Sequence, residues 1–473
     1  MVNMAYDYEL LAIGCGPAGQ RAAIQTAKLG RRVAVVERPN HVGGVCTNTG
    51  TVPSKTLRAA ALDLTGLLQK DMYGDAYRVK AQITIEDLFW RTRRVIDRET
   101  EVIRDQLSRN HVDLLTGTAR FIDEHTLDLG PEGGNRRVTA ENIVIAVGTT
   151  PVQPDDVEFD GRTVLDSDSI LQLERIPATM TIVGAGVIGI EYASVFAAIG
   201  VRVTVIERQA RLLSFVDAEI IEALQYHLRE LRVSLRFSET VTAVMKSEDG
   251  RIVTQLASGK LIPSDAVLYA AGRQGATAEL ELANAGLEAD ARGRITVSET
   301  YQTAKPHIYA VGDVIGFPSL ASTSSEQGRL AACHAFGVEA RTMASLLPFG
   351  IYTIPEISTV GLNEEELTDQ AVPYVVGLAR YREIARGQIS GDTHGMLKLL
   401  VAPDSRKVLG VHIFGSAAAE LVHVGQAVIA MNGTVDYLID TVFNYPTFAE
   451  AYKVAALDAM NRLNELSVAR KVA

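Results

Sequence analysis

Two glycine-rich segments with identical spacing point most directly to chemistry in this sequence. The segment GCGPAG at 14–19 follows an apolar run, and the segment GAGVIG at 184–189 follows another. In a strand–turn–helix unit, the first glycine permits a tight turn, the second lets the backbone approach a pyrophosphate, and the third lets helix and strand pack closely. The free N–H groups that begin the helix then bind phosphate. The glycines with these predicted roles are Gly14, Gly16, Gly19, Gly184, Gly186 and Gly189.

An acidic residue stands at the same distance after each segment. Glu37 is followed by Arg38, Glu207 is followed by Arg208, and both residues of the second pair lie 170 positions after those of the first. A carboxylate at the end of the second strand can accept hydrogen bonds from ribose hydroxyls. The chain therefore contains an internal repeat. Two dinucleotide sites in one chain indicate a flavin in one site and a nicotinamide nucleotide in the other.

The charges at the end of the second repeat bear on the choice of nicotinamide nucleotide. Glu207 alone favours NAD, because its charge repels a 2′-phosphate. Arg208 and Arg211 follow closely and could pair with that phosphate. We therefore expect a site that accepts both NAD(H) and NADP(H).

The segment GGVCTNTGTVPSK at 43–55 resembles the flavoprotein disulfide reductase family. In that family two cysteines of this segment form a redox disulfide beside the flavin. Here the first is Cys46, and Thr51 stands at the position of the second. A threonine hydroxyl cannot supply the second sulfur. Cys15 and Cys333 lie elsewhere in the sequence, so neither is expected to replace it.

The C-terminal segment YPTFAE at 445–450 departs from the same family in a matching way. The family has an acid/base histidine at the position of Tyr445, which is oriented by a glutamate at the position of Glu450. A phenol with a pKa of about 10 is poorly suited to proton transfer at neutral pH. Both halves of the dithiol chemistry are thus missing together.

These two departures resemble the soluble, Si-specific pyridine nucleotide transhydrogenases, a branch of the same family. The runs at 46–58 and 443–452 match their pattern, and the similarity extends over residues 6–461. The resemblance implies non-covalent FAD, one per subunit. It also implies hydride transfer from NADPH to NAD⁺ through the flavin, with no redox disulfide.

Further family markers assign individual residues. Lys55 and Glu191 match a pair that lies against the flavin, and Asp313 matches the aspartate that holds the ribityl chain. The resemblance implies catalytic positions at Cys46, Thr51, Lys55, Glu191, Tyr445 and Glu450. The implied cofactor-binding positions, besides those of the repeats, are Gly44, Cys46, Lys55, Gly148, Gly272, Gly312 and Asp313.

Composition limits the class of protein. The 473 residues are 47% hydrophobic and 22% charged, with a net charge of −11, which is typical of a folded globular chain. No basic block stands out, so neither nucleic acid nor a membrane surface is an expected partner. Three cysteines, and an N-terminus without the basic region of a signal peptide, favour the cytoplasm. The apolar stretch 180–206 is rich in glycine and predicts strand, turn, helix and strand rather than a membrane span.

The repeat and the resemblance together predict an α/β fold with three domains. Two Rossmann-like domains would bind FAD (1–150 and 272–346) and NAD(P) (151–271), and a C-terminal α+β domain (347–473) would form a homodimer or larger homo-oligomer. In that assembly the segment 445–450 would reach the flavin of the partner. No metal is expected: His412 and His423 have no partners at ligand spacing, so they are expected to be packed or interface histidines.

Three other functions fit the same residues. A diaphorase would pass electrons to quinones, dyes or oxygen. A redox sensor would bind nucleotides without turnover. A disulfide reductase would need another cysteine as partner of Cys46. Turnover with NAD⁺ analogues, quinones and disulfides separates the three.

Overall fold

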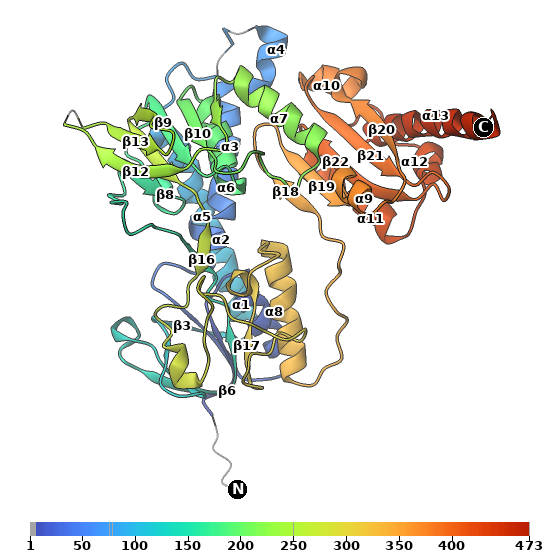
Figure 1. Ribbon diagram of the computed structural model, residues 1–473. Helices are drawn as coiled ribbons and strands as arrows, with labels where there is room; N and C mark the ends of the chain where they lie inside the picture. Colours follow the sequence, from blue (N-terminus) through green and yellow to red (C-terminus); the bar gives the residue numbers. More distant parts are fainter. Residues whose placement is uncertain (1–5, 75, 78, 249, 473) are drawn as a thin grey trace.

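The computed structural model describes residues 6–472 except 75, 78 and 249 (Figure 1). It is built from a C-terminal unit and two α/β units that contain the two predicted nucleotide turns, the first and second nucleotide units. In the view of Figure 1 the first unit lies at the bottom, the second at the upper left and the C-terminal unit at the right. Three-residue and four-residue 3₁₀ helices lie in the connections, at η1 (Leu67–Gln69), η2 (Pro131–Gly133), η3 (Ser169–Gln172), η4 (Leu282–Ala285), η5 (Gly312–Ile315) and η6 (Tyr381–Glu383).

The first repeat forms the centre of a seven-stranded sheet with the order β3-β2-β1-β6-β5-β4, in which β17 also pairs with β6. The strands are β1 (Tyr8–Ile13), β2 (Val33–Glu37), β3 (Asp113–Thr116), β4 (Arg120–Phe121), β5 (Thr126–Asp128), β6 (Arg137–Ile145) and β17 (Ile308–Ala310). Helices α1 (Pro17–Lys28) and α8 (Ala321–Ala335) pack so closely that a Cβ at Gly328 would lie 2.0 Å from the Ala18 carbonyl oxygen. The chain thus returns after residue 300 to complete the first unit.

The second repeat forms a five-stranded parallel sheet with the order β11-β10-β9-β15-β8. Its strands are β8 (Val164–Asp166), β9 (Thr179–Val183), β10 (Arg202–Ile206), β11 (Ser234–Arg236) and β15 (Ala266–Tyr269), and its helices are α6 (Val187–Ala198) and α7 (Ala218–Glu230). The register repeats as well: Leu10 pairs with Val33, and Met180 pairs with Val203. The internal repeat of the sequence is therefore a repeat of structure.

The apolar stretch 180–206 folds as predicted into strand, turn, helix and strand. Helix α6 is buried from Gly189 to Ala198 because its sequence is apolar on nearly all sides, with Glu191 as its one charged residue. No helix in the described part of the chain is long and apolar enough to cross a membrane.

Smaller elements connect the two nucleotide units. The chain passes between them on the antiparallel pair β7 (Thr149–Pro151) and β16 (Arg273–Gly275). An antiparallel sheet of β12 (Val241–Lys246), β13 (Ile252–Leu256) and β14 (Leu261–Ser264) extends from the second unit. Between β2 and β3 the chain forms four helices, which are α2 (Gly44–Asn48), α3 (Thr51–Thr65), α4 (Lys70–Tyr73) and α5 (Ile85–Arg109). The long helix α5 starts at a capping box formed by Thr84 and Asp87.

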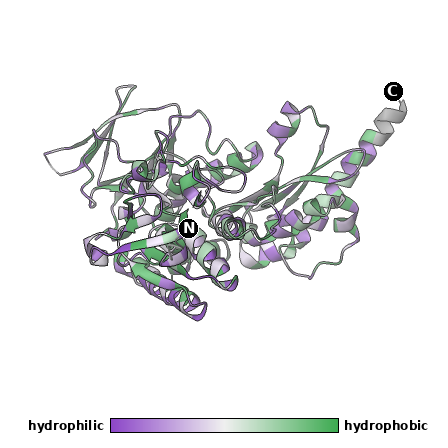
Figure 2. Ribbon diagram, turned by 90° about the horizontal axis from the view of Figure 1, so that it is seen from below, coloured by the Kyte–Doolittle hydropathy of each residue, from purple (hydrophilic) through white to green (hydrophobic). Residues whose placement is uncertain are grey.

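The C-terminal unit is an antiparallel sheet with the order β18-β19-β22-β21-β20. Its strands are β18 (Phe349–Ile351), β19 (Ile357–Gly361), β20 (Val375–Arg380), β21 (Met396–Val401) and β22 (Val408–Phe414). Its helices are α9 (Glu364–Asp369), α10 (Ala385–Ser390), α11 (Ala418–Ala430), α12 (Val435–Asp440) and α13 (Glu450–Val472). Helix α13 packs against β20 and β21, where Ala451, Ala455 and Ala459 are buried, and its axis points away from the rest of the molecule (Figure 2).

Candidate flavin and nicotinamide nucleotide sites

The glycine turn of the first repeat is closed on two sides and open on one. A Cβ at Gly14 would lie 2.4 Å from the carbonyl oxygen of Ala146, and one at Gly19 would lie 1.9 Å from that of Gly14. A Cβ at Gly16 would meet no atom within 4 Å. The first and third glycines are therefore required by packing, whereas the middle glycine keeps space free above the turn.

The second repeat has the same steric pattern. A Cβ at Gly184 would lie 2.7 Å from the Ala270 carbonyl oxygen, and one at Gly189 would lie 2.0 Å from that of Gly184. Gly186 again faces open space. Helices α1 and α6 have no acidic residue in their first turns, so the positive ends of both helix dipoles face these spaces without a competing carboxylate.

The acid of the first repeat is fixed beneath its glycine turn. Glu37 accepts hydrogen bonds from the backbone N–H of Cys15 (2.7 Å) and of Arg38 (2.8 Å). Burial raises the pKa of the Glu37 carboxyl, and the two backbone donors oppose that rise. The carboxylate is thus held in one orientation next to the open space.

Glu207 repeats this arrangement in the second unit. It accepts from the backbone N–H of Ala185 (2.7 Å) and of Gln209 (2.8 Å). Among the described residues, Arg208 is exposed and forms no ion pair. Arg211 is engaged elsewhere, because its guanidinium lies 2.8 Å from Glu365 and donates to the carbonyl of Val216 (3.0 Å). Of these two arginines, Arg208 is therefore the one that is not engaged by a carboxylate among the described residues.

A cavity of about 370 Å³ runs along the first repeat. The predicted residues that line it are Gly14, Gly16, Glu37, Arg38, Gly44, Cys46, Thr51, Gly148, Gly312 and Asp313. Burial raises the pKa of the Asp313 carboxyl, which Ser324 contacts at 3.4 Å. An open phosphate turn, a fixed acid for a ribose and a second acid for hydroxyl groups fit the parts of FAD.

Residues that the sequence did not predict also line this cavity. They include Thr118, Thr149, Gln274 and Ser324. Arg273 lies next to it and connects the two nucleotide units, since it donates to Thr149 Oγ1 (2.9 Å) and pairs with Asp168 (2.9 Å). In the sequence, Arg273 is signalled only as part of the family marker that begins at Gly272. The structure gives Gly272 a φ of +119°, which favours glycine.

Cys46 faces this cavity as a free thiol. All three cysteines of the chain are free, and Cys15 and Cys333 are buried elsewhere. Burial raises the pKa of Cys46, while a hydrogen bond with Thr51 opposes that rise. The side chain is therefore a thiol rather than a thiolate at neutral pH.

Lys55 and Glu191 form a mostly buried ion pair between α3 and α6. Lys55 Nζ lies 2.6 Å from Glu191 Oε2, and it also lies over the Tyr352 ring at 4.9 Å. The other carboxylate oxygen accepts from the backbone N–H of Tyr352 (2.8 Å). One pair thus joins the first unit, the second unit and the chain that follows β18.

Tyr445 and Glu450 lie apart from this cavity. Tyr445 is 72% exposed and lines no part of the cavity. Glu450 has one buried carboxylate oxygen without a hydrogen-bond partner among the described residues. Within one chain, the structure does not bring these two residues to the predicted flavin site.

The predicted histidines differ in their surroundings. His412 is buried, with Nδ1 at 2.6 Å from Thr359 Oγ1 and Nε2 at 3.0 Å from the carbonyl of Leu362. His423 is exposed and contacts Gln426 at 2.9 Å. The packed assignment therefore holds for His412 but not for His423 within this chain.

Comparison with family models agrees with this architecture. The family described as pyridine nucleotide-disulphide oxidoreductase matches residues 8–328. The dimerisation domain of the same family matches residues 347–456.

Individual relatives and solved structures are similar to this chain over nearly its whole length. The soluble pyridine nucleotide transhydrogenase of Mycobacterium bovis is 57% identical, over 98% of this chain and 100% of its own length. That of Shigella flexneri is 46% identical, over 97% and 99%. The HOCl-induced flavoprotein disulfide reductase RclA from Escherichia coli superposes with a TM-score of 0.86 at 28% identity, over 95% and 99% of the two chains. LpdA from Mycobacterium tuberculosis gives 0.86 at 25% identity, with the same coverage.

Proposed function

The chain belongs to the pyridine nucleotide-disulphide oxidoreductases and, among them, to the soluble pyridine nucleotide transhydrogenases, and we propose that it transfers hydride from NADPH to NAD⁺ through FAD. One observation carries this proposal. The cavity along the first repeat is lined by residues suited to each part of FAD, and Cys46, the one cysteine among the described lining residues, lies beside Thr51 instead of a second cysteine. A disulfide relay is not needed when both substrates are nicotinamide nucleotides. The proposal includes Si-specificity and one non-covalent FAD per subunit.

The protein contributes binding and alignment to this reaction. Bound FAD supplies an acceptor that takes a hydride from one nicotinamide and returns it to another. The first glycine turn and α1 would hold its pyrophosphate, Glu37 a ribose and Asp313 the ribityl hydroxyls. The ion pair between Lys55 and Glu191 would fix one wall of the flavin site. The second glycine turn would position each nicotinamide nucleotide in turn, and alignment at van der Waals distance accounts for much of the rate.

We infer that the active form is a homodimer or larger homo-oligomer. The C-terminal unit matches a dimerisation domain, and its surface exposes large apolar side chains. Met431 is 84% exposed, Val442 90% and Tyr445 72%. Large apolar side chains that are exposed on one unit favour a protein contact there. Segment 445–450 would then contact the flavin site of the partner subunit.

The choice of electron acceptor tests the proposed function. The purified protein is expected to be yellow, to release FAD on heating, and to reduce an NAD⁺ analogue with NADPH faster than it reduces quinones or disulfides. Cys46→Ser should keep most of this activity, because no step uses a sulfur. Steady-state rates with each acceptor, and anaerobic titration to two electrons per flavin, provide the measurements.

Three outcomes would contradict parts of this proposal. A colourless protein that does not bind added FAD would overturn it entirely. Faster turnover with quinones would favour a diaphorase, and nucleotide binding without turnover would favour a sensor. A Cys46→Ser variant that retains FAD but loses activity would show that the thiol takes part in the reaction.

Arg208 is predicted to select for NADPH. A charge-assisted hydrogen bond to the 2′-phosphate contributes roughly 1.5–3 kcal/mol, so Arg208→Ala should weaken kcat/KM for NADPH about 10- to 100-fold and leave NADH nearly unchanged. Glu207→Gln should shift the preference towards NADPH, because it removes a repelling charge. Steady-state kinetics of each variant with each nucleotide measures the ratio.

Arg211→Ala serves as the matched control for this prediction. Its guanidinium already pairs with Glu365, so its loss should change the NADPH-to-NADH ratio far less than the loss of Arg208. An equal decrease for both nucleotides in Arg208→Ala would place the phosphate contact elsewhere.

A further inference from the structure

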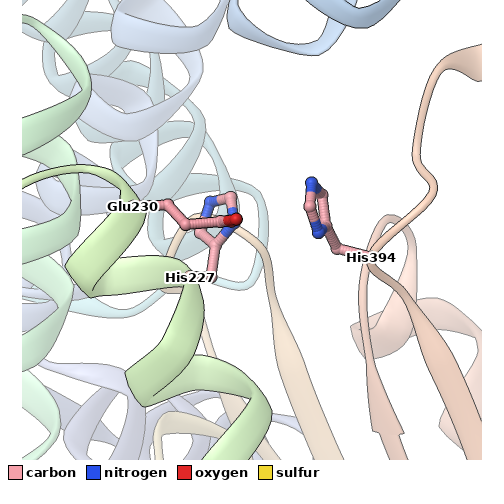
Figure 3. Close-up of side chains that lie close together, drawn as sticks. All are labelled: His227, Glu230 and His394. Atoms are coloured by element: carbon pink, nitrogen blue, oxygen red, sulfur yellow. The ribbon is translucent and has the colours of Figure 1, made fainter.

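Two histidines and a glutamate from distant parts of the sequence meet on the surface between the second nucleotide unit and the C-terminal unit. His227 and Glu230 lie on the last turn of α7, and His394 lies in the loop between α10 and β21. Their ligand atoms all lie within 4.8 Å of one another. Figure 3 shows Glu230 beside the His227 ring, with His394 facing both from the other unit.

The donor set and its spacing suit a transition metal. Two imidazoles and one carboxylate are a common zinc ligand set with a fourth position open for water. Metal–ligand bonds of about 2.0–2.1 Å in a tetrahedron place the donors about 3.3 Å apart. The distance from His227 Nδ1 to Glu230 Oε2 is already 3.7 Å, and the two imidazole rings lie 5.2 Å apart. Small side-chain rotations are sufficient to complete the site.

The backbone on both sides of the cluster is well anchored. Helix α7 buries Ile220, Leu224 and Leu228 in the core of the second unit. The loop that carries His394 is held by Asp392, whose carboxylate accepts from the backbone N–H of Gly395 (3.1 Å) and of Ser416 (2.6 Å). Only side chains need to move, and such preorganisation favours metal binding.

A cluster of three carboxylates at the opposite end of α7 differs from the histidine cluster because it already contains a cation. Asp217, Glu219 and Glu364 could also hold a cation, but the ammonium of Lys398 already lies among them. Among the described residues, Glu230 pairs with His227 and with no lysine or arginine. The histidine cluster is therefore the one that suits an external metal ion.

We propose that His227, Glu230 and His394 bind one divalent transition-metal ion of the zinc type. The ion would tie the end of α7 to the C-terminal unit, just as Lys398 ties its beginning. None of the three residues lines the flavin cavity, so the site is separate from the path of the hydride. Its expected effect is to hold the two units together and to stabilise the folded chain.

Metal binding to the FAD-loaded protein tests this proposal directly. After treatment with a chelator, titration with ZnCl₂ followed by calorimetry should give one ion per subunit and raise the melting temperature. His394→Ala should weaken this binding about 100-fold or more, since loss of even an outer partner of a metal ligand costs roughly 10- to 100-fold. Glu230→Gln should weaken it as well. His394 and Glu230 are exposed, so both variants are expected to fold.

Two further variants separate this site from other zinc-binding groups. His423→Ala removes an exposed histidine outside the cluster and should leave the affinity unchanged. Cys46→Ser should also leave it unchanged, because the thiol is not among the ligands. The proposal is overturned if zinc does not bind, or if it binds equally well to His394→Ala. Binding that depends on Cys46 instead would likewise overturn it.

Discussion

Gly186→Val is expected to abolish reduction by NADPH and by NADH while leaving FAD bound. The backbone of Gly186 (φ −66°, ψ 179°) is one that valine adopts, and a Cβ there meets no atom within 4 Å. The substitution therefore leaves the turn intact and fills the space reserved for the pyrophosphate. Loss of two charge-assisted hydrogen bonds, roughly 1.5–3 kcal/mol each, lowers kcat/KM about 10²- to 10⁴-fold.

Two comparisons make this expectation specific. Dithionite should still bleach the flavin of Gly186→Val, whereas the mirror substitution Gly16→Val should yield protein without FAD. Gly189→Ala should instead lower the melting temperature, because its Cβ would lie 2.0 Å from the carbonyl oxygen of Gly184. Rapid reduction of Gly186→Val by NADPH would show that the pyrophosphate does not approach the second turn.

The features that the sequence predicts well are those that depend on local spacing. The repeat of glycine turn and acid fixes the strand–helix–strand unit, and Glu37 and Glu207 indeed bond to equivalent backbone groups. Helix α5 carries the same kind of local signal, since a capping box formed by Thr84 and Asp87 precedes an amphipathic sequence.

The features that the sequence could not predict are contacts between distant segments. The sequence makes Arg211 a candidate partner of a 2′-phosphate, and no pattern near it signals the ion pair that it forms with Glu365 of the C-terminal unit. His227 and His394 likewise meet only because α7 lies against the C-terminal unit. Lys55 and Glu191 were paired in advance by family resemblance, not by spacing. Side-chain partners across units depend on the packing of whole domains.

Lys398→Met is expected to destabilise the protein strongly. Lys398 is fully buried, and its ammonium lies 2.9 Å from Asp217 and 3.0 Å from Glu219, with Glu364 also in contact. Burial opposes the charge, but the three carboxylates outweigh it and raise the pKa of Lys398. Removing the cation leaves the buried carboxylate of Asp217 uncompensated. Such a loss costs about 3–5 kcal/mol.

The pH dependence of this loss follows from the pKa of Asp217. Burial works to raise that pKa, but His412 and Lys398 outweigh it and lower it below the ordinary value. A carboxyl whose pKa is depressed by folding contributes stability above its unfolded pKa of about 3.9, and that stability is lost as the pH falls. The difference in melting temperature between wild type and Lys398→Met should therefore be largest near neutral pH and should narrow as the pH falls towards 4.

Two variants distinguish an uncompensated charge from a simple packing defect. Asp217→Asn combined with Lys398→Met removes the buried carboxylate and should recover part of the lost melting temperature, because the desolvated charge is gone. Lys407→Met removes an exposed lysine whose ammonium donates to Asn432 Oδ1 at 3.3 Å, and it should change stability by less than about 0.5 kcal/mol. If Lys398→Met unfolds at the wild-type temperature at neutral pH, the three carboxylates do not depend on this cation. The contact between α7 and the C-terminal unit must then be maintained by its other interactions, such as the ion pair of Arg211 with Glu365.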